Sequence, residues 1–160
     1  MKKNKVPKFS EPPRAIIITF STQFFYELGF ENYDEEYGKP CKKNFILYGY
    51  KLFLRQMHAM QQDPESYWCQ TLANPPAEYT ENLQYCYISI LKKIRFKASI
   101  LSFERGTKDK PIIKKKFSDG KTISSKGWIL LNNFVKTREF PKNGFQGFRY
   151  VIPGSEIDKL

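Results

Sequence analysis

The pattern of apolar and polar positions is most regular in the first half of the chain, where it predicts helices. Residues 44–62 carry apolar side chains at intervals of three and four, the spacing of a helix that buries one face. Residues 15–30 fit the same spacing, although 16–20 alone could form a strand. Residues 64–72 predict a further short helix that begins at a proline. We therefore expect a mainly helical subdomain over residues 14–76 whose net charge is close to zero.

Residues 80–103 satisfy two patterns at once. Seven apolar positions fit one helical face, and this fit favours a single long helix. The alternation of apolar and polar residues from Ile94 to Ile100 instead predicts two strands, and this alternative stays open. Asn74-Pro75-Pro76 interrupts the chain just before this region, so we place a subdomain boundary there.

The rest of the chain predicts short elements. Residues 112–117 are β-branched and charged, as in an edge strand or ribbon, and 118–121 predict a turn. Residues 122–134 predict a short helix, and 134–152 predict a β-hairpin around Asn143-Gly144. The expected fold is therefore α+β. A helix followed by a hairpin is the element order of winged-helix proteins, although no family motif accompanies it.

Two boundary predictions complete the domain organisation. Residues 1–13 hold four lysines and three prolines without periodicity, which predicts a flexible basic arm. Residues 77–160 form a basic α+β subdomain that could equally belong to one domain with 14–76.

Composition narrows the class of protein. The 160 residues are 41% apolar and 27% charged, as in a globular protein, and no apolar run reaches membrane-spanning length. Three cysteines at spacings of 28 and 17 residues fit neither a disulfide framework nor a metal knuckle. We therefore expect a cytoplasmic protein with reduced thiols.

Charge is the strongest functional signal. The net charge is +11, of which residues 81–160 contribute seventeen basic and seven acidic residues, or +10. Such asymmetry indicates a polyanionic partner. The residues expected to contact it are Lys92, Lys93, Arg95, Lys97, Arg105, Lys108, Lys110, Lys114, Lys115, Lys116, Lys121, Arg138, Lys142, Arg149 and Tyr150.

These residues predict a non-enzymatic nucleic-acid-binding protein, acting on DNA in preference to RNA, as an accessory or regulatory factor of a phage or mobile element. Lysine outnumbers arginine, and lysine meets phosphate as a point charge, so binding should depend on salt more than on sequence. The alternative is a module or inhibitor that docks its basic face on an acidic protein. The first half is rich in tyrosine and has a net charge close to zero, and this keeps that alternative open.

Enzymatic chemistry has little support. His58 is the sole histidine, and no nucleophile-elbow, Walker, zinc-protease or dinucleotide motif occurs. Asp109 and Asp119 flank the expected ribbon, so a magnesium-dependent nuclease is a distant alternative. Cys41, Cys69 and Cys86 lack the close pairing of zinc ligands. We expect neither a metal nor a cofactor.

Overall fold

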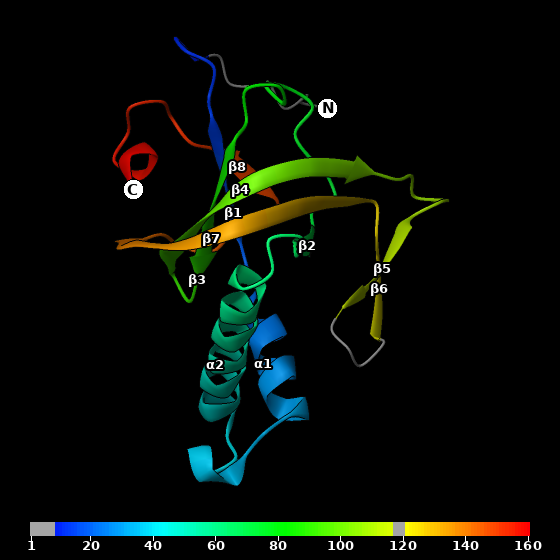
Figure 1. Ribbon diagram of the computed structural model, residues 1–160, viewed down its shortest axis with the longest axis vertical. Coiled ribbons are helices and arrows are strands. Elements are labelled where there is room, and N and C mark those ends of the chain that lie inside the picture. The colour runs from blue at the N-terminus through cyan, green and yellow to red at the C-terminus, as the bar shows by residue number, and fades with distance from the viewer. Residues whose placement is uncertain (1–8, 117–120) are drawn as a thin grey trace, which may run out of the picture.

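The computed structural model describes residues 9–116 and 121–160 and shows a mixed α+β fold (Figure 1). Two helices lie against one face of a six-stranded sheet, and a two-stranded ribbon extends from one end of that sheet. In chain order the elements are β1 (Ala15–Thr19), α1 (Thr22–Glu31), η1 (Glu35–Tyr37), α2 (Lys42–Gln61), β2 (Trp68–Thr71), β3 (Tyr85–Ile90), β4 (Lys93–Arg105), β5 (Ile112–Lys116), β6 (Lys121–Ser125), β7 (Gly127–Pro141), β8 (Phe148–Tyr150) and η2 (Ile157–Lys159).

The sheet has the strand order β2-β7-β4-β3-β1-β8. β1 runs parallel to β3, while the other neighbouring strands are antiparallel. A parallel pair needs a long crossover connection, and α1, α2 and β2 lie within the one between β1 and β3. Because β1 and β2 come from the first half of the chain, both halves share this sheet.

The helices pack unusually close to each other. Ser21 caps α1, and its hydroxyl accepts a hydrogen bond from the backbone N–H of Phe24 at 3.1 Å. Gly29 of α1 and Gly49 of α2 face each other so tightly that a Cβ on Gly49 would lie 1.8 Å from the carbonyl oxygen of Phe25. This backbone contact sets how deeply the Phe25 and Phe53 rings, 5.5 Å apart, enter the core beneath the sheet.

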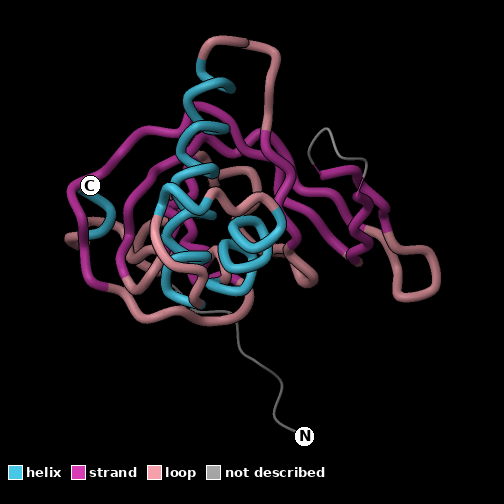
Figure 2. Tube along the Cα trace, turned by 90° about the horizontal axis from the view of Figure 1, so that it is seen from below, coloured by secondary structure: helices cyan, strands magenta, loops and turns pink. Residues whose placement is uncertain are grey.

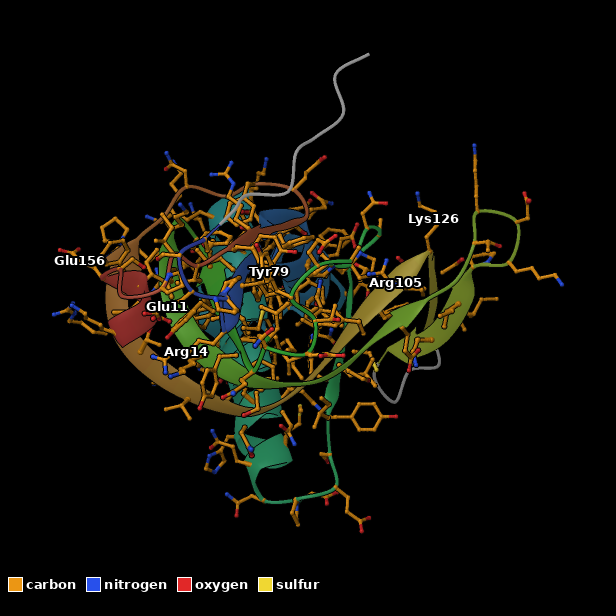
Figure 3. The ribbon with its side chains drawn as sticks, turned by 90° about the horizontal axis from the view of Figure 1, so that it is seen from above. Glu11, Arg14, Tyr79, Arg105, Lys126 and Glu156 are labelled. Carbon is orange, nitrogen blue, oxygen red and sulfur yellow. The ribbon has the colours of Figure 1, made fainter. Side chains whose placement is uncertain are left out.

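The second face of the sheet is covered in part by the C-terminal segment, residues 151–160 (Figure 3). Val151, Ile157 and Leu160 pack on Ala15, Ile17 and Tyr87 in a separate apolar cluster. Asp158 holds the segment in place, because its carboxylate accepts hydrogen bonds from Arg14 Nε at 3.1 Å and from the backbone N–H of Gly154 at 2.9 Å. β4 and β7 extend beyond this cover.

Two predictions from the periodicity are confirmed. The helix expected at 44–62 is α2, and the charged strand expected at 112–117 is β5. Residues 15–30 divide at Ser21 into a strand and a helix, so the alternative strand for 16–20 is also correct. Residues 1–8 of the predicted arm and residues 118–120 of the predicted turn lie outside the described residues.

The long helix at 80–103 is wrong, and the alternative of two strands is correct. β3 and β4 meet at a tight turn in which Leu91 and Lys92 have φ values of 51° and 67°. Two successive positive φ values are typical of a type I′ hairpin turn. Residues 86–88 bury side chains on both faces of the sheet, so this part of β3 shows no alternation of apolar and polar residues. Without that alternation, its apolar positions also fit the spacing of a helix.

The helices at 64–72 and 122–134 and the hairpin at 134–152 are also wrong. Residues 68–71 form β2, and 121–141 form β6 and β7, because the run Trp128–Leu131 is buried on both sides of the sheet. β8 pairs with β1 instead of β7. The helix that a winged-helix plan requires before its hairpin is therefore replaced by strands. None of the described helices is long and apolar enough to cross a membrane.

Candidate nucleic-acid interface

A lysine-rich arm, defined here as residues 105–126, joins the far ends of β4 and β7. Its strands β5 and β6 pair with each other from Ile112↔Ser125 to Lys116↔Lys121 and form a sheet of their own. The ribbon projects from the body of the molecule in both orthogonal views (Figures 1 and 2). The arm holds eight basic and two acidic residues, a net charge of +6 out of the +11 of the chain.

The base of the arm is fixed to the sheet. Arg105 donates hydrogen bonds to the carbonyl oxygens of Pro75 and Pro76 in the loop before β3. The indole N–H of Trp128 donates to the carbonyl oxygen of Ile112 at 3.1 Å. The backbone N–H of Gly106 donates to the carbonyl oxygen of Lys126 at 2.6 Å. These bonds make Arg105 a structural residue and hold the arm in a defined direction.

One lysine of the arm is committed to a neighbouring carboxylate. Lys114 Nζ lies 2.7 Å from Glu104 Oε2, and this hydrogen bond raises the pKa of Lys114 above its usual value. Lys114 also occupies the half-buried face of β5, on the same side as Ile112. It therefore anchors the ribbon, and its charge is already partly balanced before any partner binds.

Among the arm lysines whose side chains the structure describes, three others are exposed to solvent: Lys108, Lys110 and Lys126. Lys126 lies at the base of the arm (Figure 3) and is absent from the predicted set, because residues 122–134 predict a helix apart from the basic stretch. The strand register places Lys115 opposite Thr122 and Lys116 opposite Lys121.

The turn between β3 and β4 places three more predicted residues away from the arm. Lys93 Nζ and Arg95 NH1 each lie 3.0 Å from a carboxylate oxygen of Glu139 on β7. The hydrogen bond from Lys93 and the charge of Lys93, followed by the charge of Arg95, lower the pKa of Glu139 below its usual value. Arg95 also lies 5.7 Å from the ring centre of Tyr50 on α2. Lys93 and Arg95 therefore stabilise the fold, and Lys92 remains exposed on the turn.

Five predicted residues lie elsewhere. Lys97 is half-buried on β4, opposite Tyr87 on β3 and Val135 on β7. Arg138 is exposed on β7, and Lys142 follows that strand. Arg149 on β8 stacks over Phe145, with 4.4 Å between the guanidinium carbon and the ring centre. Tyr150 donates a hydrogen bond to the carbonyl oxygen of Glu78 at 3.0 Å and is partly buried. β8 and the arm-bearing strand β7 are separated by β4, β3 and β1, so the predicted set does not form one continuous surface.

The residues considered for catalysis or metal binding do not come together. His58 lies on α2, Cys41 precedes that helix, Cys69 lies on β2 and Cys86 on β3. Within the described part of the chain, no group of three or more histidine, cysteine, aspartate or glutamate side chains could hold a metal ion. Asp109 is exposed in the arm, and Asp119 lies outside the described residues.

The cysteines provide a direct test of the core. Cys86 is fully buried in β3, and burial raises the pKa of its thiol far above its usual value. Because the thiolate is the reactive form, we expect Cys86 to resist a thiol reagent at pH 8 while exposed Cys41 reacts readily. Peptide mapping after short labelling, with and without guanidinium, measures this difference. Equal labelling of Cys41 and Cys86 in the native protein would contradict the described core.

Comparison of the chain with protein-family models, with curated proteins and with solved structures found no match in any of the three.

Proposed function

We propose that the protein is a non-enzymatic nucleic-acid-binding protein that contacts double-stranded DNA through the lysine-rich arm. The observation that carries this proposal is the arm itself, a ribbon outside the main sheet that holds +6 of the net charge of +11. Its base is fixed by Arg105 and Trp128 while Lys108, Lys110 and Lys126 stay exposed. A rigid support that presents exposed lysines is suited to contact with a phosphate backbone.

The shape of the arm favours duplex DNA over duplex RNA. The major groove of B-form DNA is wide enough to admit a two-stranded ribbon, whereas the major groove of A-form RNA is too narrow for side chains to enter. The arm, in place of the helix of a winged-helix plan, is then the element that enters or borders the groove. Lysine side chains meet phosphates as point charges, so we expect limited base discrimination.

A titration at two salt concentrations tests the proposal. We expect labelled duplex DNA to bind in 50 mM salt and to lose roughly 1,000-fold in affinity at 200 mM, as about six released counterions would require. Single-stranded DNA and duplex RNA of the same length should bind more weakly at each salt concentration. Fluorescence anisotropy reports all three affinities. If duplex DNA does not bind even in 50 mM salt, the proposal is wrong.

One observation favours a second candidate, a protein that docks on an acidic partner. Ile113 is 66% exposed on the ribbon, and among the described strands β5 and β6 pair only with each other. An unpaired ribbon edge can accept a strand from another protein. Copurification with one acidic protein that survives nuclease treatment, together with absent duplex binding, would select this function.

A further inference from the structure

The face of the sheet opposite the helices carries an open hollow that is separate from the arm. The C-terminal segment packs on β1 and β3, and its Leu160 lines the hollow together with residues of β4 and β7. The hollow has a volume of about 420 Å³, within the range of small-ligand sites. Its walls include Tyr85, Lys97, Ser99, Val135, Thr137 and Arg138.

Lys97 is a half-buried cation in this hollow. The register of β4 places it between Tyr87 on β3 and Val135 on β7. Its ammonium group lies 4.1 Å from the ring centre of Tyr85 and 5.6 Å from that of Tyr87. Lys97 takes part in no ion pair within the described part of the chain. A charge that has lost part of its hydration without gaining a carboxylate is favourably placed to bind an anion.

The other walls add chemistry that suits a flat organic group. Val135 is 60% exposed, which leaves an apolar surface open next to the ammonium of Lys97. Ser99 and Arg138 add hydrogen-bond donors. The described lining, which also includes Leu160, holds three basic side chains and no acidic side chain. A kink at Asn133, where φ is 53°, borders the hollow along β7. The combination favours a ligand with an anionic end and an apolar, ring-shaped body.

We propose that this hollow binds a nucleoside 5′-phosphate, either as a free nucleotide or as the terminal residue of a nucleic-acid strand. The phosphate would lie against Lys97 and Arg138, and the base would rest on Val135. The choice of a nucleotide rests on the proposed function, because the same two strands carry the lysine-rich arm. About 25 Å separates Lys97 from the base of the arm, at the rise of about 3.3 Å per residue along β4.

The test is a calorimetric titration of the full chain with 5′-AMP, adenosine and inorganic phosphate, alongside a 5′-phosphorylated oligonucleotide. We expect 5′-AMP to bind more tightly than either of its parts. Lys97→Gln should weaken this binding roughly tenfold, the effect of losing one charge-assisted contact. Val135→Glu should abolish it, and the exposure of that position lets the variant fold. Lys43→Gln, on α2 and away from the hollow, should bind like the wild type.

The possible results separate the hollow from the arm. If the phosphorylated oligonucleotide binds in a Lys97-dependent manner and free 5′-AMP does not, the ligand is a strand end. The absence of Lys97-dependent binding of both ligands would overturn the inference, even if duplex DNA binds the arm. Binding of inorganic phosphate as tight as that of 5′-AMP, or 5′-AMP binding that survives both substitutions, would also overturn it. Nucleotide binding at the hollow without duplex binding would refute the proposed DNA-binding function of the arm and leave the inference about the hollow in place.

Discussion

Removing the charge of the exposed lysines of the arm is expected to reduce affinity for duplex DNA by about 100-fold in 0.1 M salt. The variant combines Lys108→Gln, Lys110→Gln and Lys126→Gln, which lie outside the ion pairs of the described residues. Each lost phosphate contact removes about one unit from the slope of log affinity against log salt concentration. The slope should therefore fall by about three units. Fluorescence anisotropy over a range of salt concentrations measures both quantities.

A matched control separates a local contact from general attraction to a basic protein. Lys39→Gln, Lys42→Gln and Lys43→Gln remove the same charge from exposed positions at and near the start of α2. These residues lie at the end of the helical pair that points away from the sheet (Figure 1). We expect the control variant to lose less than about threefold in affinity, because screened charges at a distance contribute little. Equal losses in the two variants would refute a footprint on the arm.

Local pattern was sufficient to predict elements whose burial differs between their two sides. α2 buries Tyr48, Phe53 and Met57 and exposes the opposite face, so its helical period is visible in the sequence. In β5, half-buried Ile112 and Lys114 flank exposed Ile113, so its strand character is visible too. The strands at the centre of the sheet could not be identified in this way. β3 is packed by helices on one face and by the C-terminal segment on the other, and a continuous apolar run fits a helix equally well.

Turn chemistry gave no help at the β3–β4 connection. A type I′ turn usually carries asparagine or glycine, because both central residues need positive φ values. Here Leu91 and Lys92 occupy those positions, so the sequence contains no hairpin signal. Asn143-Gly144 does carry such a signal, yet β7 and β8 lie on opposite sides of β4, β3 and β1. The strand pairing is therefore set by contacts between distant parts of the chain, even where the local residues favour a different hairpin.

The distribution of charge in the sequence predicted a basic half. It did not predict which basic side chains are bonded to other groups of the protein. Lys93 and Arg95 share Glu139, which is more than forty residues away in the chain. Arg105 is bonded to two proline carbonyl oxygens, and Lys114 to Glu104. These partners depend on strand register, which the sequence did not reveal. Lys126 was omitted for the same reason, since its place at the base of the arm becomes apparent only once β6 and β7 are known to be strands.

Replacing Gly49 by alanine is expected to lower the free energy of unfolding by about 3 kcal/mol or more. Helix propensity alone predicts the opposite, a gain of about 1 kcal/mol for alanine over glycine inside α2. The added Cβ would lie 1.8 Å from the carbonyl oxygen and 2.7 Å from the carbonyl carbon of Phe25. Both are backbone atoms, so no side-chain rotation relieves the overlap, and the two helices must move apart. Urea unfolding followed by tryptophan fluorescence measures the loss.

Gly147→Ala is the matched control, because it adds the same methyl group where the structure has space. Nothing lies within 4 Å of a Cβ at this position, and the cost comes only from its φ of 76°. Such backbone strain amounts to about 1 kcal/mol. We expect Gly49→Ala to be clearly less stable than Gly147→Ala, because separating α1 from α2 also loosens the contact between Phe25 and Phe53. If Gly49→Ala instead matches or exceeds the wild type in stability, helix propensity dominates and the close backbone contact between α1 and α2 does not exist.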